Sequence, residues 1–88
     1  MHDLNESTAI VTGGARGIGL SLARALAENG ARVGLVDILQ DVESAAEDLT
    51  RHTGKESLGI QADVRDPDAI DAAFSTVTDK LGVPDILI

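Results

Sequence analysis

Hydrophobic residues along this chain follow two alternating patterns. Short continuous runs occur at residues 9–11, 33–36, 58–60 and 86–88, partly β-branched and bounded by glycine or charged residues. Continuous apolar runs of this length are typical of parallel strands that are buried on both faces. We therefore expect strands near residues 8–13, 32–37, 57–62 and 84–88.

Between these runs, the apolar residues recur with the spacing of an amphipathic helix. In the first such segment, Ile18, Leu22 and Leu26 recur every four residues, which predicts that they form its buried stripe. The second segment has the weaker stripe Val42, Ala46 and Leu49, and the third has the clearest one, Ile70, Ala73, Phe74, Val77 and Leu81. Asp66 and Pro67 precede the third stripe as an N-cap and a first helical residue.

Strands that alternate with helices of ten or more residues predict a parallel sheet. The expected fold class is α/β, a Rossmann-like doubly wound parallel sheet, of which residues 1–88 supply the first half in the order β-α-β-α-β-α-β. With the strand order 3-2-1-4, right-handed crossovers place the first two helices on one face of the sheet and the third on the other. The apolar strand at residues 84–88 then forms an open edge, and we expect the single domain to be truncated after this fourth strand.

Composition narrows the possible functions. The formal charge is −8, and the acidic residues are scattered along the chain, so there is no basic patch of the kind that binds nucleic acid. The chain has no cysteine, which excludes disulfides and thiolate metal sites and fits a cytoplasmic protein. Its longest apolar runs are too short to cross a membrane, and its polar, acidic first residues do not resemble a signal peptide.

A glycine-rich segment, VTGGARGIGL, joins the first strand to the first helix. Gly13, Gly17 and Gly19 have the spacing G-x-x-x-G-x-G. Glycines allow a tight turn and leave no Cβ between the backbone and a ligand. The free N–H groups and the positive dipole end of the helix that follows attract an anion such as a pyrophosphate.

Two related motifs fit less well. The fingerprint G-x-G-x-x-G fails because its third glycine would be Leu22. The P-loop spacing is met by Gly14 and Gly19, with Ser21 in place, but Leu20 stands where the lysine is required, which makes a nucleoside triphosphatase a poor reading. A glycine-rich turn with no ligand remains an alternative for the motif taken alone.

Asp37 ends the second strand, eighteen residues after Gly19. In dinucleotide-binding folds, an acidic residue at this place binds the adenosine ribose hydroxyls. A turn residue or helix cap is the competing interpretation, and the position of Asp37 relative to the glycines favours ribose binding.

With TGGARGIG after one strand, Asp37 after the next and Ala62-Asp63-Val64 after the third, the chain resembles the N-terminal part of the short-chain dehydrogenase/reductase (SDR) family over residues 7–88. The resemblance implies that Gly13, Gly17, Gly19 and the Ile18 N–H group hold the cofactor pyrophosphate. It also implies that Asp63 and the Val64 backbone face the adenine edge, although Asp63 could instead be a turn or helix cap.

The same resemblance implies an NAD(H)-dependent oxidoreductase that transfers hydride between a nicotinamide cofactor and an alcohol or carbonyl substrate. A homo-oligomer is expected for the full-length protein. The catalytic Ser and Tyr-x-x-x-Lys of the family are absent, since the chain has no tyrosine, and neither His2 nor His52 is expected to replace them. The 88-residue chain alone is therefore predicted to be inactive. A non-catalytic nucleotide-binding or interaction module remains the alternative.

The residues near the expected ribose site include charges that favour different cofactors, NAD and NADP. Arg16 is a cation that could meet the 2′-phosphate of NADP, whereas Asp37 is an anion where that phosphate would lie, and Ile38 adds no positive charge. The repulsion between carboxylate and phosphate is larger than the attraction between the phosphate and an exposed arginine. We expect NAD to be preferred over NADP.

Overall fold

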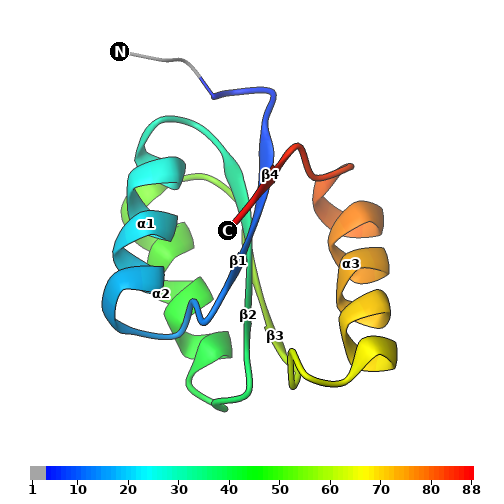
Figure 1. Cartoon of the computed structure of the whole chain (residues 1–88). Helices are drawn as coiled ribbons and strands as arrows, with labels where there is room; N and C mark the ends of the chain where they lie inside the picture. Colours follow the sequence, from blue (N-terminus) through cyan, green and yellow to red (C-terminus); the bar gives the residue numbers. More distant parts are fainter. Residues whose placement is uncertain (1–3) are drawn as a thin grey trace.

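Strands and helices alternate along the chain in the computed structural model, which describes residues 4–88 and therefore not His2. In chain order the elements are β1 (Thr8–Thr12), α1 (Gly17–Glu28), β2 (Arg32–Asp37), α2 (Val42–Thr53), β3 (Ser57–Gln61), α3 (Pro67–Leu81) and β4 (Ile86–Leu87). The predicted α/β alternation is confirmed (Figure 1). No helix in residues 4–88 is long and apolar enough to cross a membrane.

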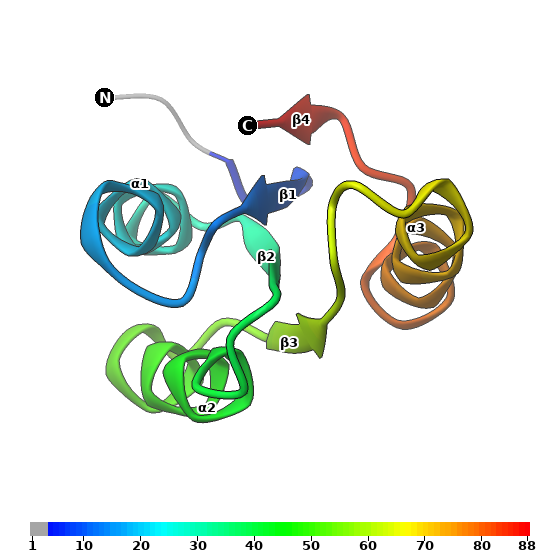
Figure 2. The same ribbon diagram turned by 60° about the horizontal axis from the view of Figure 1, so that its bottom comes forward.

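The four strands form one parallel sheet in the order β3-β2-β1-β4, as predicted. Helices α1 and α2 lie on one face of this sheet and α3 lies on the other (Figure 2). The buried residues accordingly form two clusters. The larger one, which includes Val11, Val33 and Leu35, lies under α1 and α2, and the smaller one, which includes Ile10 and Val36, lies under α3.

Helix α1 packs through a different face from the one that its large residues predicted. Ala23 and Ala27 are its buried residues, whereas Ile18 is 81% exposed and Leu22 is 39% exposed. The small alanines allow the helix to lie close against β1 and β2, which turns Ile18 and Leu22 away from the sheet. The predicted stripe is therefore wrong for α1, although Leu26 does pack against the larger cluster.

The other two helices pack through the predicted faces, with Ile70 and Phe74 of α3 only partly buried. Helix α2 buries Val42, Ala46 and Leu49, and α3 buries Ala73, Val77 and Leu81. Asp66 caps α3, because its side chain accepts hydrogen bonds from the N–H groups of Asp68 and Ala69, and Pro67 occupies the first helical position, as expected.

The two outer strands are less buried than their sequences predicted. Only β1 and β2 are buried along most of their length, because each has a neighbouring strand on both sides. Strand β4 is two residues long rather than five, and Leu87 is 63% exposed. Backbone hydrogen bonds to β1 nevertheless continue on both sides of it, from Asp85 N–H to Thr8 O and from Ile88 N–H to Ile10 O, both at 2.9 Å.

Candidate functional site

The chain segments with the predicted site residues meet at one edge of the sheet. Gly13 follows β1, Asp37 ends β2, and Asp63 comes two residues after β3. Because the strands are parallel, their carboxyl ends share an edge, at the bottom of Figure 1. Ligands of open α/β sheets bind outside this edge, next to the point where the strand order reverses, which here is β1.

Two close contacts shape the glycine-rich loop. The Gly13 N–H donates to Val36 O at 2.8 Å, which holds the start of the loop against the end of β2. A Cβ on Gly19 would lie 2.8 Å from the Gly13 carbonyl carbon and closer still to its oxygen. Only glycine at position 19 lets α1 begin directly above the end of β1.

The first turn of α1 has backbone N–H groups without a capping side chain. Arg16, in the N-cap position, makes no side-chain hydrogen bond to the helix, and no acidic residue lies in the first turn. Gly17 has φ 63°, a left-handed conformation that favours glycine, and a Cβ there would meet no atom within 4 Å. This differs from α3, where Asp66 and Asp68 supply a cap and a first-turn acid. The start of α1 therefore offers donors, positive dipole and free space to an anion.

Asp37 lies beside this loop and is half-buried. Its Oδ2 accepts a hydrogen bond from the Ala15 N–H at 3.0 Å, and its Oδ1 accepts one from the Leu39 N–H at 3.1 Å. Each carboxylate oxygen has a second lone pair, so the group can accept further hydrogen bonds from a ligand's hydroxyls. Arg16 and Ile38 flank this region as exposed side chains.

The segment after β3 holds its carboxylate with a neighbouring arginine. Asp63 Oδ1 accepts from Arg65 N at 2.9 Å and from Nε at 3.1 Å, and Oδ2 accepts from Nη2 at 2.9 Å. The side-chain hydrogen bond from Arg65 is the largest cause of a lowered Asp63 pKa. Asp63 thus acts as a turn-forming residue in this structure, while Val64 beside it is 52% exposed.

Three contributors to this edge were not expected from the sequence. The N–H groups of Ala15 and Leu39 bind Asp37, and Arg65 binds Asp63. The spacing of Asp63 and Arg65 in the segment D-V-R could have predicted their ion pair. The backbone N–H groups of Ala15 and Leu39 could not be predicted, because every residue except proline has such a donor.

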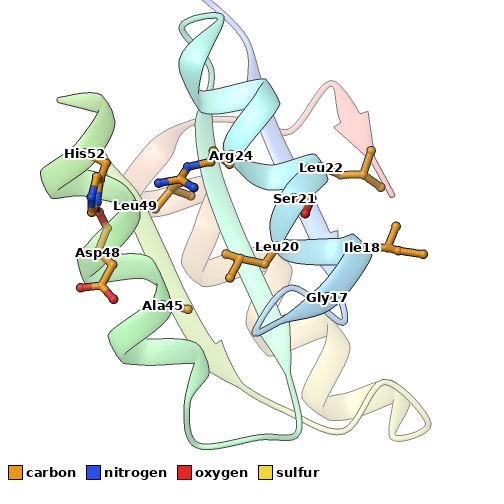
Figure 3. Close-up of a pocket in the computed structure, with 10 residues that line it drawn as sticks. All are labelled: Gly17, Ile18, Leu20, Ser21, Leu22, Arg24, Ala45, Asp48, Leu49 and His52. Atoms are coloured by element: carbon orange, nitrogen blue, oxygen red, sulfur yellow. Dashed lines mark hydrogen bonds between the residues drawn. The ribbon is translucent and has the colours of Figure 1, made fainter.

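A groove lies between α1 and α2, lined on the helix α1 side by Leu20 and Arg24 and on the α2 side by Leu49 and His52 (Figure 3). Ile18 and Leu22 point away from α2 in this view. Its lining includes Gly17 and Ile18, so the groove adjoins the start of α1, although it does not include Gly13, Asp37 or Asp63. Nowhere in residues 4–88 do His, Asp or Glu side chains cluster as a metal site requires.

A parallel sheet of this order with a glycine-rich turn after its first strand has a Rossmann-like α/β architecture. Residues 7–88 match the sequence model of the family described as short chain dehydrogenase. The chain therefore belongs to this family, as its resemblance implied.

Named relatives and solved structures agree. The oxidoreductase UcpA of Escherichia coli K12 is 39% identical over the whole chain, which spans 33% of that protein. The 1-deoxy-11-beta-hydroxypentalenate dehydrogenase of Streptomyces avermitilis is 42% identical over 99% of the chain and 32% of its own length. The L-sorbose reductase of Gluconobacter frateurii, solved with NADPH and L-sorbose, superimposes with a TM-score of 0.87 at 34% identity, over 92% of this chain and 31% of that one. The chain thus spans about a third of the length of these relatives.

Proposed function

We propose that this chain is the NAD(H)-binding part of a short-chain dehydrogenase/reductase that transfers hydride between nicotinamide and an alcohol or carbonyl substrate. One observation carries the proposal. The uncapped, glycine-lined start of α1 and the Asp37 carboxylate lie together where parallel strands end, so an anion site adjoins a hydroxyl acceptor. A dinucleotide presents both groups, a pyrophosphate and a ribose.

The residues divide the binding task by their chemistry. Gly13 and Gly17 have open space where a Cβ would lie, which leaves the pyrophosphate access to backbone donors that include the Ile18 N–H group, and Gly19 lets the first turn of α1 pack against Gly13. Asp37 accepts from the ribose hydroxyls. The bound nicotinamide supplies the hydride chemistry, while the protein contributes position and electrostatics.

The adenine end of the cofactor meets the segment after β3. The backbone of the exposed residue Val64 and the Asp63 carboxylate face the adenine edge, where adenine competes with Arg65 for the carboxylate.

Catalysis needs a proton donor and acceptor that this chain lacks. The sequence contains no tyrosine, and His52 lies on the last turn of α2 with its Nδ1 2.8 Å from Asp48 O, away from the sheet edge. Loss of a positioned acid or base typically lowers rates by about 10² to 10⁴. We propose that the 88-residue chain alone does not turn over cofactor, and that the acid, base and substrate pocket come from protein beyond these residues.

Asp37 favours NAD over NADP. A 2′-phosphate carries about −1.5 to −2 charge, and each unit charge 4 Å from a carboxylate is repelled by about 4 kcal/mol at an effective dielectric near 20. The exposed Arg16 returns only about 0–1 kcal/mol. The NADPH complex of L-sorbose reductase is the opposing consideration, because that protein has the same fold.

Titration of the chain with NADH and NADPH, followed by calorimetry, tests the proposal. We expect the chain to bind NADH more tightly than NADPH, and we expect Asp37→Ala to reduce the difference between the two affinities. Tighter binding of NADPH by the unaltered chain would overturn the preference for NAD. Binding of neither cofactor by a chain that circular dichroism shows to be folded would overturn the cofactor site and leave a non-catalytic interaction module, which the absence of tyrosine also suits.

A further inference from the structure

The Asp37 side chain ties the glycine-rich loop to the end of β2. Its Oδ2 accepts from the Ala15 N–H at 3.0 Å, and its Oδ1 accepts from the Leu39 N–H at 3.1 Å. One carboxylate therefore joins two turns, one after β1 and one after β2. The remaining ties between this loop and β2 come from the backbone, where the N–H groups of Gly13 and Gly14 approach Val36 O at 2.8 and 3.5 Å.

The hydrogen bond to Ala15 has no ready substitute. Ala15 is only 5% exposed and belongs to the larger buried cluster, so its N–H group has little access to water. A buried donor that loses its acceptor incurs the full penalty of its lost hydration. Without the carboxylate, the loop would have to shift to bring this donor into contact with water.

We propose that Asp37 is a positioning residue for the anion-binding loop, in addition to any contact with ribose. It fixes Ala15, and through Ala15 the course of residues 13–17 into the first turn of α1. The part of this inference that concerns pyrophosphate rests on the proposed function, whereas the tie itself does not. Since each oxygen keeps a free lone pair, the carboxylate can hold the loop and accept hydroxyls at the same time.

Two substitutions of Asp37 that remove the same negative charge distinguish its role in holding the loop from a contact with ribose. Asp37→Asn leaves one oxygen that can accept from either Ala15 or Leu39, but its amide nitrogen is a donor and cannot accept from the other. Asp37→Ala leaves no acceptor for either. Asp41→Asn removes a carboxylate that makes no side-chain cap hydrogen bond and serves as the control for charge.

Amide hydrogen exchange measures the tie directly. We expect the Ala15 amide to exchange about 10- to 100-fold faster in Asp37→Ala, which corresponds to the loss of a charge-assisted hydrogen bond. Asp37→Asn should give a smaller summed increase at Ala15 and Leu39, and Asp41→Asn none, while the Val77 amide in α3 reports on unfolding in every variant. Unchanged exchange at Ala15 in Asp37→Ala, or an equal rise at Val77, would overturn the proposal. If Asp37→Ala does not fold, Asp37→Asn decides: no change at either amide would overturn it.

Binding of inorganic pyrophosphate, which has no ribose, gives the second test. Both variants lose the same negative charge, so a carboxylate that only contacted ribose would leave them with equal pyrophosphate affinity. We expect Asp37→Ala to bind pyrophosphate about 5- to 30-fold more weakly than Asp37→Asn, the range expected if one loop residue must be ordered anew. Equal affinities would refute the positioning role. Faster exchange at Ala15 with no NADH binding by the unaltered chain would instead refute the proposed function and leave the tie in place.

Discussion

Gly19, in the first turn of α1, packs directly against the carbonyl group of Gly13 at the end of β1. The two glycines set the distance between the helix and the strand that precedes it. This contact opposes the usual effect of alanine, which is a better helix former than glycine by about 0.5–1 kcal/mol.

Gly19→Ala should therefore destabilise the protein, because overpacking typically costs about 1–3 kcal/mol and exceeds the gain in helix propensity. For a domain of this size, each 1 kcal/mol lowers the Tm by about 4–8 °C. Thermal unfolding followed by circular dichroism measures the effect. Ser21→Ala, at an exposed position of the same helix, is the control and should leave the Tm unchanged or higher. A higher Tm for Gly19→Ala would contradict the packing argument.

Gly17 and Gly54 form a matched pair for testing the anion site. They have similar left-handed φ angles of 63° and 72°, and a Cβ on either would meet no atom within 4 Å. Alanine at each should cost about 1–2 kcal/mol of stability through backbone strain alone. Only Gly17 lies at the start of α1, so only Gly17→Ala should weaken NADH binding, by about tenfold if a single backbone hydrogen bond of about 1.4 kcal/mol is lost. Equal NADH affinities of the two variants would argue against pyrophosphate binding at this turn.

Arg65→Ala should raise the pKa of Asp63 toward its ordinary value, because the arginine hydrogen bond is the main cause of the lowered pKa. A carboxyl whose folded-state pKa is lowered stabilises the fold above its unfolded-state pKa, and this contribution disappears as the pH falls through the folded-state value. A carboxyl carbon NMR titration measures the shift. Since the pair is exposed, 1 M salt should reproduce part of the effect in the unaltered chain. A pKa that Arg65→Ala leaves unchanged would show that the ion pair does not persist in solution.

The outer edge of β4 predicts self-association or marginal stability of the isolated chain. Leu87 is 63% exposed on a strand at the edge of the sheet, and Ile18 and Ile88 add exposed apolar surface. Unpaired strand edges bind one another unless charge opposes it. We expect Leu87→Lys to lower the apparent mass in sedimentation and to reduce binding of a hydrophobic dye. Val64→Lys, which adds the same charge at a residue that is 52% exposed but outside the strands, should have little effect. A sharply melting monomer that binds no dye would contradict this expectation.

The order of elements could be predicted because each one has a strong local signal. The apolar runs gave β1 and β2 to within one residue, and the Asp66-Pro67 pair gave the start of α3. The buried face of α1 could not be predicted from large residues, because the fully buried positions of this helix are the small residues Ala23 and Ala27.

At the site, glycine spacing and chain order were enough to bring Gly13, Asp37 and Asp63 to one edge, since parallel strands end together. The hydrogen bond from Ala15 to Asp37 joins residues 22 positions apart through a backbone donor. Such a contact depends on how closely two loops approach each other, and the pattern of side chains along the sequence does not predict that distance.

Strand β1 has partners at very different distances along the chain. Ala9 pairs with Val33, 24 positions later, and with Ile86, 77 positions later. Closing the longer loop costs about 1 kcal/mol more than closing the shorter one, and β4 offers only two paired residues in return. During synthesis, β1 and β2 are complete, with α1 between them, well before residues 85–88 are added. One side of β1 stays open throughout this time, so a chaperone or a neighbouring nascent chain has its best opportunity to bind there before β4 arrives.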